Sequence, residues 1–112
     1  MLSINVEYRK NVLFIRLIGK LNKNNFYKIN DELDNLINKL GINNIVFNFD
    51  ELYSIDTYSV NCLINWHNLI KERRGVSYIC GIHNYHKLNN LLSCIKEISN
   101  ELCAIRVINW NN

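Results

Sequence analysis

Short apolar runs alternate with longer segments of helical periodicity along most of this 112-residue sequence. Such alternation favours a parallel sheet, because each parallel pair of strands needs a crossover connection, and these crossovers are right-handed. The sequence opens differently: residues 2–9 alternate apolar and polar side chains, and residues 12–18 are almost continuously apolar. These patterns predict a half-buried strand and a more central strand, paired antiparallel through a tight turn at residues 9–11.

The remaining segments alternate between helix and strand signals. In residues 22–40, apolar side chains recur at intervals of three and four, Asn22 or Asn24 can cap the start, and Gly41 suits the left-handed stop. This is an α/β fold with a mixed sheet, in the order β-β-α-β-α-β-α-β, within one domain of residues 1–112. The predicted elements are strands 2–9 and 12–18, helix 22–40, strand 44–49, helix 57–74, strand 76–82, helix 86–98 and strand 102–108.

Composition narrows the class of protein. Apolar residues make up 48% of the chain, which is enough for one modest core, and the net charge is only +3. The one local basic cluster, Lys71, Arg73 and Arg74, suits the C-terminus of a helix. We therefore expect no direct binding of nucleic acid. No apolar run approaches the ~18 residues of a membrane span, so we expect no membrane insertion either.

The cysteines and histidines have no metal-binding spacing. The four cysteines include no CxxC pair, which favours reduced thiols and a cytoplasmic protein with no metal site and no cofactor. The sequence has neither a glycine-rich phosphate loop nor a nucleophile paired with a base, so we expect no catalytic residues. A small enzyme that uses Asp56 with a nearby hydroxyl or histidine would lack a second catalytic carboxylate and an oxyanion loop.

The helix predicted at residues 57–74 is unusually apolar. On a helical wheel, Asn65, Asn68 and Glu72 fall within ~40° of Asn61 and form one narrow polar stripe. The apolar side chains spread over roughly 220°, whereas a surface helix needs only ~100° or somewhat more. Either the helix is clamped between the sheet and a neighbouring helix, or its apolar surface around Trp66 receives a partner. A packed, hydrogen-bonded role is expected for His67. The polar stripe consists of Asn61, Asn65, Asn68 and Glu72.

Polar side chains cluster where strand 44–49 leads into this helix. Asp56, Thr57, Tyr58 and Ser59 occupy the predicted first turn. Asp56 or Thr57 as N-cap satisfies free backbone N–H groups, which is worth ~1 kcal/mol, and a carboxylate complements the positive end of the helix. Capping explains one acid and one hydroxyl. An exposed site for modification or binding would explain the whole cluster.

Several ordered motifs resemble the STAS domain of bacterial anti-sigma factor antagonists. Residues 17–22, LIGKLN, look like the family's G-x-L-D element, with Asn22 in place of Asp. Residues 44–56, NIVFNFDELYSID, look like its third strand and loop, and residues 57–64, TYSVNCLI, stand where the family usually carries S-S-G-L-x-x-L. Gly75 and Gly81 also match family glycines. The resemblance covers about residues 2–108, and the tail looks shorter than usual, so we expect the family's final helix to be missing.

This resemblance implies an open mixed sheet, no enzymatic activity and a protein-binding role. In such antagonists, a hydroxyl residue at the start of the second helix is phosphorylated by a partner that is both anti-sigma factor and serine/threonine kinase. The unmodified form binds that partner and the phosphorylated form releases it. For this chain, the resemblance implies a protein partner of the same type and a monomer or weak homo-oligomer.

The sequence departs from the family at the acceptor. The usual serine aligns with Tyr58 and the usual glycine aligns with Ser59. Some relatives, including components of stressosomes, carry Thr or Ser immediately after the Asp, which Thr57 matches. The acceptor candidates are therefore Thr57 first, Ser59 second and Tyr58 last. The partner-binding residues are predicted to be Asn22, Asp50, Glu51, Ser54, Asp56, Thr57, Tyr58, Ser59 and Asn61.

A structural role is the alternative hypothesis for the function. Non-phosphorylated STAS proteins serve as scaffold subunits of stressosome-like assemblies or as accessory subunits of transporter ATPases. Both use the same fold as the antagonists. A scaffold assembles into large particles, whereas an antagonist stays small, so size separates the two readings.

Overall fold

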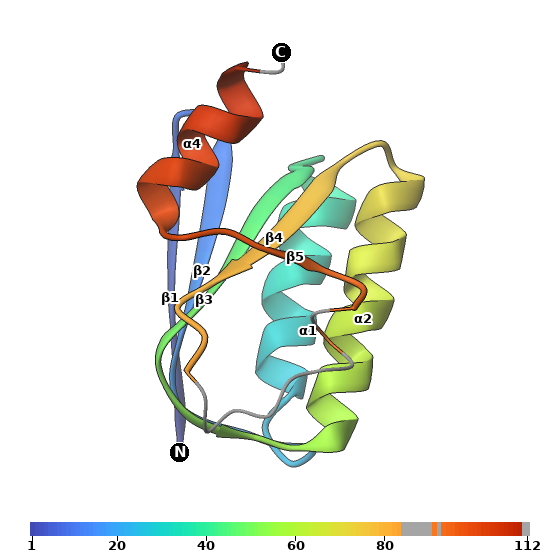
Figure 1. Ribbon diagram of the computed structural model, residues 1–112. Coiled ribbons are helices and arrows are strands. Elements are labelled where there is room, and N and C mark those ends of the chain that lie inside the picture. The colour runs from blue at the N-terminus through green and yellow to red at the C-terminus, as the bar shows by residue number, and fades with distance from the viewer. Residues whose placement is uncertain (84–90, 92, 111–112) are drawn as a thin grey trace.

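A mixed β-sheet with helices on both faces forms the protein (Figure 1). The computed structural model describes residues 1–83, 91 and 93–110. The strands lie in the order β1-β2-β3-β4-β5. The elements are β1 (Leu2–Arg9), β2 (Val12–Leu21), α1 (Tyr27–Leu33) and its π-helical continuation η1 (Asp34–Lys39), β3 (Asn44–Ile55), α2 (Thr57–Glu72), β4 (Val76–Cys80), β5 (Lys96–Glu97) and α4 (Glu101–Trp110).

The predicted opening hairpin is confirmed. Strands β1 and β2 pair antiparallel, with Arg9 opposite Val12. Lys10 and Asn11 between them have φ of 55° and 69°. Positive φ at both central residues is the geometry of the two-residue hairpin turn whose twist matches that of the flanking strands.

The predicted parallel pairing is also confirmed. Strands β2, β3, β4 and β5 run parallel, with Leu13 opposite Ile45 and Asn44 opposite Val76. Helices α1 and α2 make the crossovers and lie side by side on one face of the sheet (Figure 1). The carboxyl ends of β2 and β3 therefore meet at the end of the molecule where both crossover helices begin.

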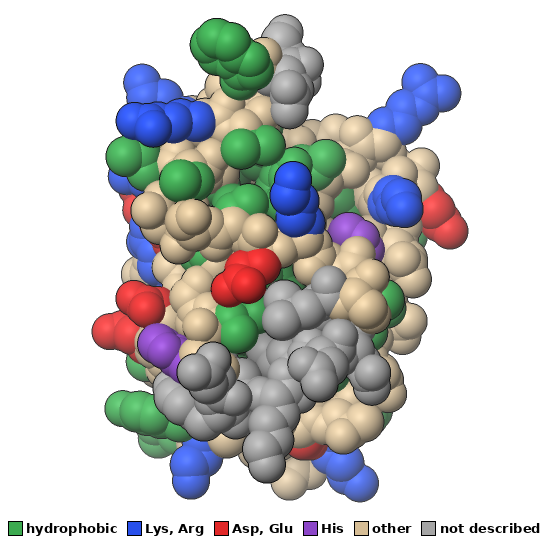
Figure 2. Space-filling model, viewed as in Figure 1, with side chains coloured by type: hydrophobic (Ala, Val, Ile, Leu, Met, Phe, Trp, Pro, Cys, Tyr) green, Lys and Arg blue, Asp and Glu red, His purple; other side chains and the backbone are tan. Residues whose placement is uncertain are grey.

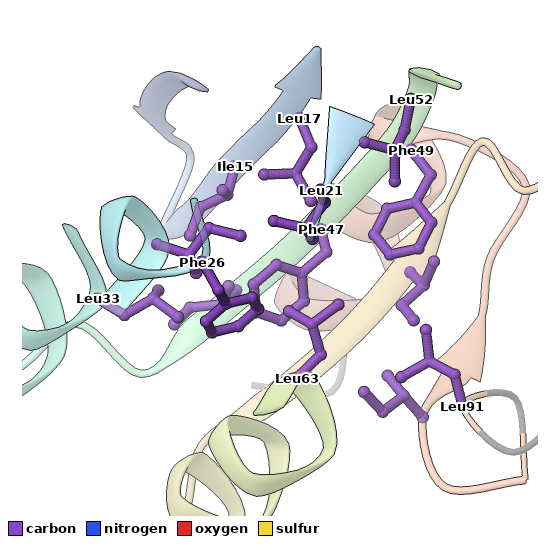
Figure 3. Close-up of a cluster of buried hydrophobic side chains, with 14 of the residues drawn as sticks. Ile15, Leu17, Leu21, Phe26, Leu33, Phe47, Phe49, Leu52, Leu63 and Leu91 are labelled. Atoms are coloured by element: carbon purple, nitrogen blue, oxygen red, sulfur yellow. The ribbon is translucent and has the colours of Figure 1, made fainter. Parts of the chain in front are cut away.

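Two hydrophobic cores flank the sheet. The larger core lies between the sheet and helices α1 and α2, where Phe26, Phe47, Phe49 and Leu63 pack together (Figure 3). The smaller core lies beneath α4 on the opposite face. This two-sided burial explains why residues 12–15 and 17 of β2 are all buried. The buried residues of the smaller core are Val12, Phe14, Val46, Cys80, Ala104 and Ile108.

The final element corrects the sequence prediction. The strand predicted at residues 102–108 is wrong, as is the expected loss of a final helix, because Glu101–Trp110 form α4. The side chain of Asn100 accepts a 2.9 Å hydrogen bond from the N–H of Cys103, which caps the first turn. Ala104 and Ile108, four residues apart, pack on the sheet. Residues four apart share one face of a helix and also of a strand, so this pair did not distinguish the two, and the β-branched residues 105 and 107 favoured a strand.

Several boundaries also differ from the prediction. The helix predicted from residue 22 begins at Tyr27, and neither Asn22 nor Asn24 caps it. The third strand extends to Ile55 instead of ending at Phe49, and the fourth ends at Cys80. Of the helix predicted at residues 86–98, positions 86–90 and 92 lie outside the described residues. Its predicted end is wrong, since residues 96–97 form strand β5.

A partly buried ion pair attaches α4 to the sheet. Arg16 on β2 donates to both carboxylate oxygens of Glu101 at 2.8 and 2.7 Å, and also to Glu7 at 2.7 Å. The side chain of Asn48 on β3 donates to Glu101 at 2.8 Å. Hydrogen bonding to Arg16 lowers the pKa of the Glu101 carboxyl more than burial raises it, and Asn48 lowers it further. The first residue of α4 is thus held by two strands.

We expect Glu101→Gln to lower the free energy of unfolding at neutral pH by about 1–2 kcal/mol, because a partly exposed charged hydrogen-bonded pair is lost. The depressed folded-state pKa makes this stabilisation complete above the ordinary glutamate pKa and lost as the pH falls through the folded-state value. The difference from wild type should therefore shrink between about pH 5 and pH 3. Urea unfolding at a series of pH values measures it. Glu97→Gln, on the exposed strand β5, is the control, and a difference that grows on acidification contradicts the assignment.

Candidate functional site

Asp56 starts helix α2. Its backbone is extended, with φ −94° and ψ 169°, and one carboxylate oxygen accepts a 2.8 Å hydrogen bond from the N–H of Ser59. This is N-cap geometry, in which a side chain satisfies one of the backbone donors left free at the helix start. Of the two N-cap residues predicted, Asp56 has this role and Thr57 is the first helical residue.

The same carboxylate also binds a second segment. Its other oxygen accepts a 2.9 Å hydrogen bond from the N–H of Lys23, and the N–H of Asp56 donates to the carbonyl of Leu21 at 3.2 Å. Burial raises the pKa of the Asp56 carboxyl, but hydrogen bonds from Ser59 and from the N–H of Lys23 outweigh it, so the pKa lies below its ordinary value. The turn before α1 and the start of α2 are therefore joined through one ionised side chain.

Asn22 belongs to this turn and keeps its shape. Its side-chain oxygen accepts from the N–H of Asn24 at 2.9 Å, and its own N–H donates to the side chain of Asn25 at 2.9 Å. Asn22 is half-buried next to Lys23, which donates to Asp56. The structure thus places Asn22 and Asp56 close together. It assigns Asn22 a turn-forming role in place of the predicted helix cap.

The three hydroxyl side chains have different environments. Thr57 is exposed, while Ser59 is fully buried at 0% exposure. Tyr58 is 50% exposed, and its ring packs edge-on against Phe26 with centroids 6.4 Å apart. Only Thr57 therefore presents a small aliphatic hydroxyl to other molecules at this helix start.

Two more predicted residues lie on the exposed part of the site. Ser54, near the end of β3, is exposed and pairs in register with Lys20. Asn61 is exposed one helical turn after Thr57. Together these residues form a surface at the carboxyl ends of β2 and β3. We define the cap surface as Asn22, Ser54, Asp56, Thr57, Tyr58 and Asn61.

Asp50 and Glu51 lie apart from the cap surface. Because β3 continues as a strand to Ile55, five residues of the chain separate Asp50 from Asp56, which span at most roughly 20 Å at ~3.3 Å per residue step. Asp50 lines a hollow with residues 80–81 and 99–102, and its carbonyl is 3.0 Å from Nε2 of His83. Glu51 lines a neighbouring hollow beside Arg16. Their charges therefore surround the start of α4.

The apolar surface of α2 is largely covered. The indole N–H of Trp66 donates to the side chain of Asn30 on α1 at 2.9 Å, and Leu63 and Ile70 are fully buried. This supports the clamped arrangement over an open apolar face. His67 is half-buried, its Nδ1 is hydrogen-bonded to the hydroxyl of the buried Ser77, and burial lowers its pKa. The packed role predicted for His67 is confirmed.

The described residues gather no group of three or more His, Cys, Asp or Glu side chains that could hold a metal ion. The cysteines are free thiols, and burial raises the pKa of Cys80 to about 12. Such a thiol is protonated at neutral pH and packs as a small apolar group. The cap surface offers hydrogen-bonding groups and the exposed hydroxyls of Ser54 and Thr57.

Comparisons with known proteins bear on this geometry. The model of the STAS domain family matches residues 3–87. A curated relative, the anti-sigma F factor antagonist of Paenibacillus polymyxa, is 22% identical over 108 residues, which cover 93% of this chain and 92% of that protein.

Two solved structures share the fold. The anti-sigma factor antagonist SpoIIAA in its unphosphorylated form has a TM-score of 0.80 and 16% identity, over 96% of this chain and 98% of that one. The Bacillus cell fate determinant SpoIIAA in the phosphorylated form has a TM-score of 0.72 and 17% identity, over 94% of this chain and 99% of that one. At these identities the likeness concerns the arrangement of helices and strands.

We expect Asp56→Ala to lower the free energy of unfolding by about 1–2 kcal/mol, because it removes an N-cap and the bond to the N–H of Lys23. Asp56→Asn should lose less, since an amide oxygen also caps. Urea unfolding measures the loss, and hydrogen exchange should become faster at the amides of Ser59 and Lys23. Thr57→Ala, one residue along, is the control and should stay within about 0.5 kcal/mol of wild type. Equal losses in the two alanine variants contradict the capping role.

Proposed function

Because this chain belongs to the STAS domain family, we propose that it is a regulatory binding module of the anti-sigma factor antagonist type. It docks a protein partner, an anti-sigma factor that is also a serine/threonine kinase, through the cap surface. The observation that carries the proposal is the exposed hydroxyl of Thr57 in the first turn of a helix that Asp56 caps. The module acts by binding and has no catalytic activity of its own.

Thr57 is the proposed phosphoacceptor. It is exposed, whereas Ser59 is fully buried and would have to leave the core before a kinase could reach it. Tyr58 is a phenol, which a serine/threonine kinase does not normally modify. Free N–H groups and the helix dipole at the start of α2 make an added phosphate tolerable within the module itself.

Phosphorylation would act at the interface. A phosphate adds about −1.5 to −2 charges and three strong acceptor oxygens, next to the ionised carboxylate of Asp56. A partner packed against the cap surface would have to desolvate these charges. A penalty of ~3 kcal/mol weakens binding more than a hundredfold. The fold need not change for this to happen, and the likeness of this chain to both forms of SpoIIAA supports a local switch.

The test compares Thr57→Ala and Thr57→Glu with wild type as baits in the cytosol of the native cell. Wild type should capture a partner and release it on addition of ATP, with the mass of one phosphate appearing on the bait. Thr57→Ala should capture the same partner and keep it after ATP. Thr57→Glu should capture it much less, because a permanent charge replaces the hydroxyl.

The matched control is Ser3→Glu, which adds the same charge to an exposed residue of strand β1. It should capture the partner as well as wild type does. Release of Thr57→Ala by ATP to the same extent as wild type would exclude Thr57 as the acceptor. Equal capture by Thr57→Glu and wild type would exclude the cap surface as the docking site.

Size-exclusion chromatography distinguishes this function from the scaffold alternative. An antagonist of 112 residues should elute as a monomer or a small oligomer at micromolar concentration. A stressosome-like scaffold subunit should assemble with its partners into a particle many times larger. Elution in such a large particle from a native extract contradicts the antagonist function.

A further inference from the structure

The end of the molecule opposite the cap surface brings together the most cationic part of the chain. Several hydrogen bonds hold its segments in place. The side chain of Asn109 on α4 donates to the carbonyl of Lys10 at 2.8 Å, and the side chain of Asn44 donates to the carbonyl of Asn11 at 3.2 Å. The N–H of Val76 donates to the carbonyl of residue 43 at 2.9 Å. The β1–β2 turn, the starts of β3 and β4 and the end of α4 therefore lie side by side (Figure 1).

Seven of the 13 Lys and Arg residues of the chain cluster at this end, and all seven are exposed. They come from the β1–β2 turn, the last turn of η1, the end of α2 and the last half of α4. Glu72 is the acid that accompanies them there. Figure 2 shows blue side chains at both upper corners of the molecule. We define the basic end as Arg9, Lys10, Lys39, Lys71, Arg73, Arg74 and Arg106.

Topology explains part of this charge and leaves part unexplained. Helices α1, η1 and α2 finish at this end, where cations complement the negative helix terminus. That argument covers Lys39 and Lys71. It does not cover Arg9, which ends β1 with its guanidinium over the ring of Phe14, or Lys10, which belongs to the hairpin turn. The charge thus exceeds what helix termini require.

Exposed apolar side chains lie among these cations. Trp110 at the end of α4 is 89% exposed, Leu40 after η1 is 65% exposed, and Tyr8 at the end of β1 is 54% exposed. A shallow, mainly apolar hollow on α4 is lined by Ile105, Val107 and Trp110 together with Arg106 and Asn109. An exposed tryptophan beside Arg106, on an end of the molecule that carries further Lys and Arg, has the composition found at membrane interfaces.

We propose that the basic end binds the surface of an anionic lipid bilayer. The cations come from separate elements and form a broad surface, which suits a plane of lipid headgroups. Trp110 lies at headgroup depth, with its apolar ring toward the acyl chains. Among the described residues no helix is long and apolar enough to cross a bilayer, so the contact is peripheral. In this orientation the cap surface faces away from the bilayer and stays open to a protein partner.

The binding is weak and reversible. Each Lys or Arg near an anionic surface contributes about 1 kcal/mol, and screening reduces this at physiological salt. Binding should therefore require anionic lipid and fall as salt rises. The cations of the basic end act additively, so reversing two of them should lower the partition coefficient at least about tenfold.

The experiment is co-sedimentation of the full chain with two kinds of vesicle, at low and at physiological salt. One kind contains phosphatidylcholine alone, and the other also contains about 30 mol% phosphatidylglycerol. Wild type should bind only the anionic vesicles. Lys10→Glu with Arg74→Glu should lose this binding, and Trp110→Ala should weaken it severalfold. The chain has two tryptophans, and Trp66 is held by Asn30. A blue shift of emission on binding that is absent from Trp110→Ala would therefore assign the inserted ring.

The matched control is Lys20→Glu with Lys23→Glu, which changes the net charge equally at the opposite end of the molecule. It should bind anionic vesicles as wild type does. Equal losses in the two double variants would overturn the proposal, because net charge alone would then explain the binding. No preference for anionic over neutral vesicles at low salt would also overturn it, as would tighter binding to a short DNA or RNA duplex than to the vesicles.

Discussion

The carboxylate of Asp56 joins two segments that are 33 residues apart in the sequence, through the N–H groups of Ser59 and Lys23. One oxygen caps α2 and the other fixes the turn that precedes α1. The parallel register of β2 and β3 makes this possible, because the last residues of the two strands, Leu21 and Ile55, pair with each other. One ionised group thus holds the start of α2 against the turn that precedes α1, at the centre of the cap surface.

The parallel direction of the strands places the cap surface and the basic end at opposite ends of the molecule. In a parallel sheet covered by crossover helices, all strand carboxyl ends and helix starts lie at one end, and all helix ends lie at the other. Here the first end presents Asp56 and the exposed hydroxyl of Thr57, where the proposed phosphorylation would add charge. The second end presents the cations of the basic end. Any molecule bound at the basic end therefore leaves the cap surface free, so the two proposed interactions are compatible in one small chain.

The sequence predicted the fold well where local pattern and tertiary environment agree. Four predictions are confirmed: the strand at residues 2–9, the crossover helices, an N-cap at Asp56 and membership of the STAS family. It failed for α4, because residues 105, 107 and 108 are β-branched and favoured a strand. A usable signal was present. Residues 12–15 of β2 are continuously apolar, which is unusual for a sheet covered on one face, and the side chain of Phe14 needs the cover that α4 supplies.

The position of Asp50 and Glu51 was not readable from the sequence for a related reason. Acidic residues directly after an apolar run indicate a loop, and a loop would have brought them near Asp56. Strand β3 instead continues through two register shifts against β2, which carries these carboxylates toward α4. Pairing between strands decided the outcome, and local composition carries no information on how far a neighbouring strand extends.

Helical geometry also limits how many of the clustered hydroxyls can face solvent. Successive residues on a helix are turned by about 100°, so positions two apart point about 200° from each other. Thr57 and Ser59 therefore cannot both face solvent while α2 lies flat on the sheet, and Ser59 faces inward beside Val60 and Leu63. A cluster of three hydroxyls in the sequence thus becomes one accessible aliphatic hydroxyl in the fold. The choice of Thr57 as the proposed acceptor follows from the same packing that holds the helix. An acceptor at residue 59 would require α2 to rotate by about half a turn and expose its core face.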